Sequence, residues 1–154
     1  MSVVNEIVSN AGQVSANTSL EQPEEKVKTQ HRILVVEDDI SLARLEAHVL
    51  AAHNYSVMIV SNGELAITAL SDFTPDLVVL DLELPGLLNG WDVLQALRQN
   101  TRIPVLITTS MKPNMRKYFR IYGETRHTLD HLSKPYPMQA LLKRVKQMLM
   151  IAPQ

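Results

Sequence analysis

Residues 76–86, DLVVLDLELPG, place an unbroken apolar run directly before the acidic side chain of Asp81. The same arrangement appears in ILVVEDD at residues 33–39, and a third nearly continuous apolar run appears in IPVLITT at residues 103–109. Such runs are typical of parallel strands that are covered by helices on both faces of a sheet. They predict an α/β protein whose strands form the buried middle layer.

Short apolar runs alternate with helix-period segments from Arg32 onward, which is the pattern of repeated strand-helix units. The predicted strands are residues 33–36, 55–60, 76–80, 103–109 and, more weakly patterned, 128–133. Together with a helix after each strand, they predict a doubly wound, five-stranded parallel sheet.

The first two predicted helices have recognisable start signals. Asp39 is positioned to cap the first helix, in which Leu42, Leu45 and Val49 form one core-facing stripe. Ser61 and Glu64 have the spacing of a capping box that opens the second helix, which ends before Pro75.

The remaining helices are marked by glycine, proline and apolar spacing. Residues 90–100 predict the third helix, with Leu94 and Leu97 facing inward. Pro113 opens the fourth helix and Pro137 opens the fifth. The fifth helix has its own apolar stripe, which consists of Leu141, Val145, Met148 and Leu149.

The chain of 154 residues has room for one domain, with Lys+Arg at 15, Asp+Glu at 16 and a formal charge of −1. This balance gives no overall field that would attract nucleic acid or an anionic membrane. There is no cysteine, no signal-peptide pattern and no apolar run near the length of a membrane helix, so we expect a soluble cytoplasmic protein. We expect a flexible polar arm at residues 1–31, one folded domain at 32–150 and a tail at 151–154.

Polar side chains stand where four of the five predicted strands end. They are Glu37 and Asp38 after the first strand, Asp81 after the third, Thr109 at the end of the fourth and Lys134 after the fifth. In an open parallel sheet, ligands bind at this carboxyl edge. We therefore expect three carboxylates, a hydroxyl and an ammonium to converge there.

Crowded carboxylates repel one another unless a cation neutralises them, which indicates a hard divalent ion with oxygen ligands. Mg²⁺ fits because it accepts a few carboxylates and also binds phosphoryl oxygens. Lys134 then provides a positive charge for a phosphate, and Thr109 provides a hydrogen-bond donor.

Taken in order, the runs ILVVEDD, DLVVLDLELPG with NGWDVL after it, IPVLITTS and HLSKPY resemble the receiver domain of response regulators, the CheY-like family. The resemblance covers about residues 32–150 and suggests a stand-alone receiver. It implies a flavodoxin-like sheet with strand order 2-1-3-4-5.

The resemblance also implies a role for each residue at the strand ends. Asp81 corresponds to the phosphoacceptor, and Thr109 and Lys134 to the residues that hold the phosphoryl group. The implied Mg²⁺ ligands are Asp38 directly, Glu37 through water, Asp81, and the backbone carbonyl of Glu83. Phosphate would come from a sensor histidine kinase or a phosphotransfer protein, and the acyl phosphate would hydrolyse slowly, so the domain is not an enzyme beyond this self-directed chemistry.

The resemblance places the output on the face of the fourth helix, fifth strand and fifth helix, where a downstream protein or a second copy in a homodimer would bind. Thr109 and His131 would be the switch residues, although the family usually has Tyr or Phe where this chain has His131. That histidine either fills the aromatic site or responds to pH. Direct DNA binding is not expected, because no DNA-reading helix pair remains.

Further departures from the family lie beside Asp81 and in residues 109–134, where the chain is a few residues longer than the family norm. The loop GLLNG at residues 86–90 is one residue longer than usual. Glu83 stands where its side chain can crowd the water that attacks the acyl phosphate, so we expect slow autodephosphorylation. Basic side chains along the fourth helix form either a solvated face or a surface for an acidic partner; they are Lys112, Arg116, Lys117 and Arg120.

Two other functions compete with the phosphoreceiver. One is a degenerate receiver that acts as a phosphorylation-independent interaction module, for which the altered loops and His131 give a motive. The other is a phosphatase or phosphotransferase with Asp81 as nucleophile, which ranks last because Glu83 replaces the second aspartate of that class.

Overall fold

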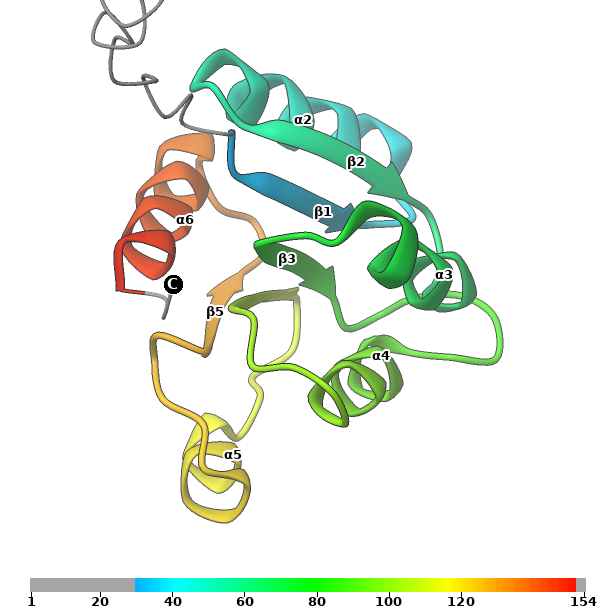
Figure 1. The fold of residues 1–154 in the computed structure, drawn as a ribbon, viewed down its shortest axis with the longest axis vertical. Helices are drawn as coiled ribbons and strands as arrows, with labels where there is room; N and C mark the ends of the chain where they lie inside the picture. The colour runs from blue at the N-terminus through cyan, green and yellow to red at the C-terminus, as the bar shows by residue number, and fades with distance from the viewer. Residues whose placement is uncertain (1–29, 152–154) are drawn as a thin grey trace, which may run out of the picture.

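The computed structural model describes residues 30–151, in which strands and helices alternate (Figure 1). The strands are β1 (Arg32–Val36), β2 (Ser56–Val60), β3 (Leu77–Asp81), β4 (Val105–Thr109) and β5 (Leu129–Ser133). The helices are α2 (Ile40–Ala52), α3 (Gly63–Phe73), α4 (Gly90–Arg98), α5 (Met115–Tyr122) and α6 (Met138–Ile151). The predicted arm and tail lie outside the described residues, except for their innermost positions.

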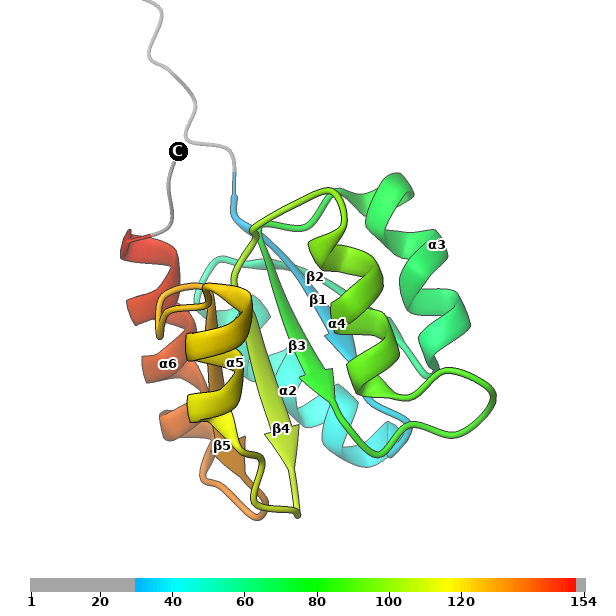
Figure 2. The same cartoon turned by 90° about the horizontal axis from the view of Figure 1, so that it is seen from below.

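The strands form one parallel sheet in the order β2-β1-β3-β4-β5, which confirms the predicted class and topology. Helices α3, α4 and α5 pack on one face, while α2 and α6 pack on the other (Figure 2). Because both faces are covered, β1, β3 and β4 are buried almost throughout.

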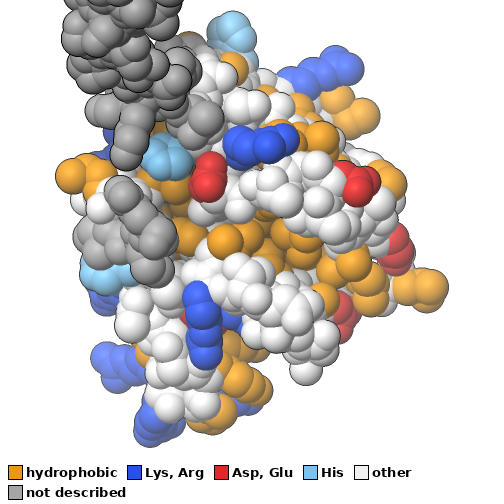
Figure 3. Space-filling model, in the orientation of Figure 1, with side chains coloured by type: hydrophobic (Ala, Val, Ile, Leu, Met, Phe, Trp, Pro, Cys, Tyr) orange, Lys and Arg blue, Asp and Glu red, His pale blue; other side chains and the backbone are white. Residues whose placement is uncertain are grey.

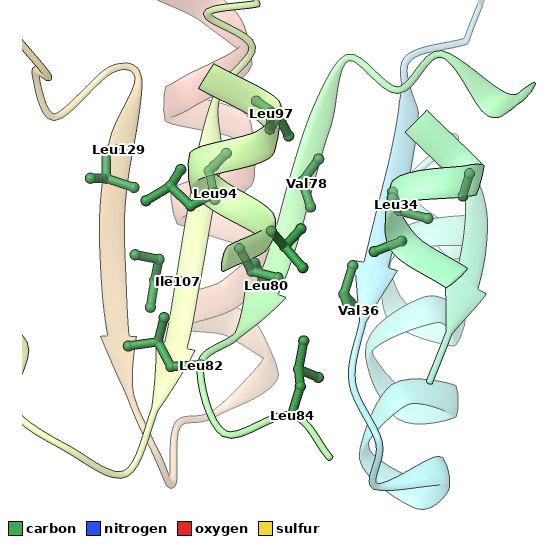
Figure 4. Packing of buried hydrophobic residues seen from close by; sticks show 14 of the residues in the cluster. Leu34, Val36, Val78, Leu80, Leu82, Leu84, Leu94, Leu97, Ile107 and Leu129 are labelled. Atoms are coloured by element: carbon green, nitrogen blue, oxygen red, sulfur yellow. The ribbon is translucent and has the colours of Figure 1, made fainter. Parts of the chain in front are cut away.

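The larger core cluster lies between the sheet and the layer of α3, α4 and α5. Figure 4 shows Leu80 and Ile107 of the sheet beside Leu94 and Leu97 of α4, and Leu34 of β1 beside α3. Burial of each such side chain stabilises the fold by roughly 1.5–3 kcal/mol. This packing holds the strand ends, and with them the polar side chains that follow, in fixed positions.

Helix α2 begins as predicted but turns a different face to the core. Asp39 caps it by accepting a hydrogen bond from the Leu42 backbone N–H at 3.2 Å. The predicted stripe is wrong, because Ala43, Glu46 and Leu50 are the buried residues and Leu45 is 48% exposed. The buried face thus includes a glutamate, which an apolar pattern does not indicate.

Two other predicted helix starts were displaced by one residue or more. Asn62, not Ser61, caps α3 and accepts from the Leu65 backbone N–H, whereas Glu64 accepts hydrogen bonds from the loop after β3. Asn114 caps α5, so Pro113 precedes that helix. In both cases an asparagine side chain satisfies the first free N–H groups.

The two remaining helices follow the predicted pattern closely. Leu94 and Leu97 of α4 are buried, although the helix ends at Arg98. In α6, Leu141, Val145 and Met148 are buried. Within residues 30–151, no helix combines the length and the apolar character needed to span a bilayer.

Candidate functional site

The polar residues predicted to converge are brought together at the carboxyl edge of the sheet. Asp81 and Thr109 are the last residues of β3 and β4, whereas Glu37 and Lys134 come directly after β1 and β5. Pairing of β1 with β3, β3 with β4 and β4 with β5 aligns these ends side by side. The elements that position the site are therefore the buried central strands.

Three carboxylates form a tight acidic cluster. Glu37, Asp38 and Asp81 each offer an oxygen, and these atoms lie within 4.8 Å of one another. Glu37 and Asp81 are 2% exposed, whereas Asp38 is exposed. Backbone N–H groups orient the two buried carboxylates, with Asp39 donating to Glu37 at 3.2 Å and Glu83 donating to Asp81 at 3.0 Å.

Lys134 lies between the two buried carboxylates. Its Nζ is 2.9 Å from Glu37 Oε2 and 3.2 Å from Asp81 Oδ2, and its backbone N–H donates to the Thr109 carbonyl at 2.8 Å. Burial acts to lower the pKa of this ammonium, but its hydrogen bond to Glu37 and the charge of Asp81 outweigh burial, so the pKa is raised. Lys134 is therefore a permanent cation at the site.

Asp81 is the carboxyl group whose proton affinity is most clearly altered. Its pKa is raised to about 7, first by burial and then by the charge of Glu37, against opposing contributions from the Glu83 N–H and Lys134. One lysine thus compensates the cluster only in part. A further cation is favoured by this charge imbalance, and the hard oxygen donors of Glu37, Asp38 and Asp81 suit Mg²⁺.

The side chain of Glu83 is bound to the end of β4. Its Oε1 accepts from the Thr109 hydroxyl at 2.9 Å, the Ser110 N–H at 3.1 Å and the Ser110 hydroxyl at 3.3 Å. Although partial burial acts to raise the pKa of Glu83, these hydrogen bonds lower it overall, so the carboxylate stays charged. Sequence reasoning placed Glu83 beside Asp81 but missed its contact with Thr109.

His131 lies on β5 opposite Ile107 and is half-buried, while His127 precedes the strand. The Nδ1 of His131 is buried without a hydrogen-bond partner among the described residues. Within residues 30–151, the acidic cluster is the one group of three or more potential metal ligands, and it contains no histidine. The switch role of His131 stays a prediction.

A second buried polar contact was not predicted. The hydroxyl of Tyr136, two residues after Lys134, donates a hydrogen bond to the fully buried Glu46 of α2. Burial raises the pKa of Glu46, even though the Tyr136 hydrogen bond opposes this. No sequence signal separates Glu46 from the other charged residues of α2, because its burial depends on how the helix packs.

Comparison with known proteins gives a consistent result. Residues 33–146 match the family described as "Response regulator receiver domain". The DNA-binding response regulator MtrA of Mycolicibacterium paratuberculosis is 35% identical over 117 residues, which is 76% of this chain and 50% of that protein. The chain therefore spans about half the length of the curated relatives it matches.

Solved structures give the same similarity. The BeF3-activated N-terminal receiver domain of Klebsiella pneumoniae RstA has 30% identity and a TM-score of 0.66 over 77% of this chain and 98% of that one. CheY4 of Vibrio cholerae, at 23% identity and a TM-score of 0.67 over 78% and 99%, shares the fold. Because MtrA is named as DNA-binding, the expectation that direct DNA binding is unlikely has no support from these relatives.

Proposed function

Because this chain belongs to the response regulator receiver domain family, we propose that it is a phosphorylation switch in which Asp81 accepts a phosphoryl group from a phosphohistidine. The donor would be a sensor histidine kinase or a phosphotransfer protein, and the reaction would take place in the cytoplasm. The observation that carries the proposal is the position of the Lys134 ammonium, 3.2 Å from Asp81 Oδ2 within an acidic cluster.

In the proposed reaction, an Asp81 carboxylate oxygen bonds to phosphorus while the phosphorus–nitrogen bond of the phosphohistidine breaks, leaving an acyl phosphate. Lys134 and Thr109 would hold phosphoryl oxygens, since one is a cation and the other a hydroxyl donor at the same edge. Phosphoryl transfer depends mainly on positioning and charge neutralisation. These two residues would supply part of both.

Receiver domains bind Mg²⁺ at an acidic site, and we propose that Glu37, Asp38, Asp81 and the Glu83 carbonyl hold it here. When bound, Mg²⁺ would supply the further positive charge that Lys134 alone does not provide to the cluster. The chain's own residues orient the acceptor: the Glu83 N–H fixes one Asp81 oxygen at 3.0 Å, and Lys134 contacts the other.

Switching would begin at Thr109. Its hydroxyl donates to Glu83 in this structure, and a phosphoryl group on Asp81 would offer a competing acceptor with more charge. Transfer of that hydrogen bond would remove one of the three contacts that hold the end of β4 and Ser110 to Glu83. We propose that the output passes to the face of α5, β5 and α6, where a downstream protein or a second copy binds.

The proposal is tested by incubating the full chain with Mg²⁺ and acetyl phosphate and measuring the intact mass. We expect a gain of one phosphoryl group in the wild type and none in Asp81→Asn. Asp76→Asn, which alters an aspartate at the opposite end of β3, is the matched control and should still be phosphorylated. Absence of the mass gain in the wild type would contradict the proposal.

A second function is favoured by one observation. Glu83 already satisfies the Thr109 hydroxyl and the Ser110 N–H, so this loop has a charged acceptor without phosphorylation. A degenerate receiver that binds its partner constitutively would use such a contact. In that case partner binding would be unchanged by Asp81→Asn.

A further inference from the structure

Helices α4 and α5 line a groove on the side of α5 that faces α4. Its larger hollow, of about 340 Å³, is lined by residues that include Trp91, Arg98, Arg102 and Tyr118. A second hollow of about 280 Å³ shares Trp91 and Tyr118 and extends to Met111 in the loop after β4. We call the two together the α4–α5 groove.

An aromatic ladder forms the middle of the α4–α5 groove. The rings of Trp91 and Tyr118 are parallel, with centroids 4.4 Å apart and planes within 1°, and Tyr118 stacks on Tyr122 at 5.3 Å. Tyr122 is 55% exposed. Aromatic side chains beside an open hollow provide a large contact area for an apolar or aromatic group at low conformational cost.

Positive charge stands at both ends of the α4–α5 groove. Lys112 and Lys117 line one end, are exposed and form no salt bridge within the described part of the chain. Arg102, at the other end, has a side chain 58% exposed. Figure 3 shows blue Lys and Arg side chains gathered at the lower left, over the region of α5.

The acid that lines the groove does not balance this charge. Glu124 is 5% exposed and its carboxylate is already bound by Arg98 at 2.5 Å, with Arg102 at 3.5 Å and the Thr128 hydroxyl at 2.6 Å. Its buried position leaves it unable to pair with Lys112 or Lys117 across the groove. The surface that an approaching partner meets is therefore aromatic in the middle and cationic at both ends.

We propose that the α4–α5 groove is a docking site for an acidic peptide segment of a partner protein, with one aromatic or other apolar side chain seated against Trp91 and Tyr118. Acidic residues flanking that anchor would pair with Lys112 and Lys117 on one side and with Arg102 on the other. Charge complementarity of this kind gives an interface its specificity and register.

A single-stranded nucleic acid also combines negative charge with flat rings, and the structure favours the peptide. Nucleic-acid grooves carry a continuous track of cations along the backbone path. Here the cations stand at the two ends of an aromatic floor, and the chain has a formal charge of −1. An anchor with acidic flanks matches that spacing of apolar and charged parts.

The groove also adjoins the proposed phosphorylation site. Leu82 follows Asp81, and Met111 is two residues after Thr109, and both line the end of the groove that contains Lys112. If phosphorylation moves the loop after β4, the groove changes shape at that end. This coupling rests on the proposed function, whereas docking itself does not, so Asp81→Asn should still bind the peptide.

The test uses selection of peptides on the full chain. A display library of random short peptides is selected on the wild-type protein, and enriched peptides are synthesised and titrated while following the fluorescence of Trp91, the one tryptophan of the chain. We expect enriched peptides to be acidic, to contain an aromatic or apolar anchor, and to change the fluorescence of Trp91 saturably.

Charge reversal locates the site. Lys112→Glu with Lys117→Glu should weaken peptide binding by about tenfold or more, since both side chains flank the anchor position. Lys143→Glu with Lys146→Glu on α6 makes the same change of charge on exposed lysines elsewhere and should leave the affinity within about twofold. Tyr122→Ala, which removes the exposed end of the ladder, is a second groove variant and should also weaken binding.

Several results would overturn the proposal. They are a failure to enrich any peptide, enriched peptides without an acidic bias, and equal binding to the groove variants and the α6 variant. A homopolymeric single-stranded oligonucleotide that changes Trp91 fluorescence where the peptides do not would assign the groove to nucleic acid instead. Far-ultraviolet circular dichroism of each variant confirms that the fold is intact before binding is compared.

Discussion

The carboxylate of Glu83 accepts a hydrogen bond from the Thr109 hydroxyl at 2.9 Å, across the edge of the sheet that carries the acidic cluster. Glu83 is two residues after Asp81, so one short segment contains both the proposed acceptor and a charged group that binds the proposed switch residue. The same carboxylate holds Ser110 through its N–H and hydroxyl. The loop after β4 is thus tied to the segment after β3 before any phosphoryl group arrives.

Replacement of Glu83 by alanine should shorten the lifetime of the phosphorylated form. The glutamate places negative charge and bulk beside Asp81, where water must approach to hydrolyse an acyl phosphate. We expect hydrolysis to accelerate by about threefold to tenfold, equivalent to roughly 1 kcal/mol of barrier. Loss of the phosphoryl mass over time measures the rate.

Asp72→Ala, on the exposed face of α3, removes a carboxylate far from the edge and serves as the control. Its phosphorylated form should decay at the wild-type rate. A wild-type lifetime of seconds that is unchanged by Glu83→Ala would count against this role for Glu83.

The pKa of Asp81 sets an expected pH dependence. This pKa is raised from 3.8 to about 7, mainly by burial. The protonated carboxyl therefore contributes its full stabilisation to the Mg²⁺-free fold when the pH is below the ordinary pKa of 3.8. That contribution is lost as the pH rises towards and through 7. Chemical denaturation in a chelator at pH 5 and pH 8 should show lower stability at pH 8, and Asp81→Asn should reduce the difference.

Mg²⁺ binding should have the opposite pH trend. Binding requires the deprotonated Asp81, so the affinity should weaken by up to about tenfold for each pH unit below 7. Isothermal titration calorimetry at several pH values measures this slope. A flat affinity between pH 5 and 7 would mean that Asp81 is not a ligand or that its proton is not displaced.

Gly90 provides a test of how closely α4 approaches the acceptor strand. A Cβ at this position would lie 2.3 Å from the Asp81 carbonyl oxygen and 2.6 Å from Leu82 Cα, so Gly90→Ala must move the backbone that carries the acceptor. We expect a loss of about 2 kcal/mol or more in the free energy of unfolding, together with weaker Mg²⁺ binding.

Gly123 is a suitable comparison, because its Cβ would meet nothing within 4 Å and its φ is +66°. Gly123→Ala should cost about 1 kcal/mol through backbone strain and leave Mg²⁺ binding unchanged. If both variants weaken Mg²⁺ binding equally, the effect is one of general stability rather than of distance from Asp81.

The strand ends were predictable from the sequence, whereas several side-chain partners were not. Runs such as Leu77–Leu80 are apolar without interruption, so their burial and their polar ends follow from composition and from parallel pairing. The contact between Glu83 and Thr109 joins residues 26 positions apart and depends on the path of two loops. No periodicity in the sequence predicts the path of these two loops.

Helix α2 shows the same limit more clearly. An apolar stripe is expected from the spacing of Leu42, Leu45 and Val49. In the structure, however, the buried residues of this helix are Ala43, Glu46 and Leu50. A glutamate is a costly core residue unless it has a partner, and its partner Tyr136 lies 90 residues away. The correct face follows from the packing of α2 near α6, which the local sequence of α2 does not contain.

The buried pair of Glu46 and Tyr136 provides the final prediction. Tyr136→Phe removes the hydroxyl that donates a hydrogen bond to Oε1 of the fully buried Glu46. The other carboxyl oxygen, Oε2, has no hydrogen-bond partner within residues 30–151, so no second contact compensates for the loss. We expect a loss of about 1–3 kcal/mol in the free energy of unfolding. Urea denaturation at pH 7 measures it.

The pH dependence separates a missing hydrogen bond from a buried charge. Burial raises the pKa of Glu46, so the neutral acid is the form that favours folding, and its stabilisation is lost as the pH rises through that raised pKa. Loss of the Tyr136 hydroxyl removes a contact that lowers this pKa, so the deficit of Tyr136→Phe should grow with pH. In Glu46→Gln, which cannot ionise, Tyr136→Phe should cost the same amount at pH 6 and pH 8. A deficit that is independent of pH in the wild-type background would show that Glu46 stays protonated throughout this range.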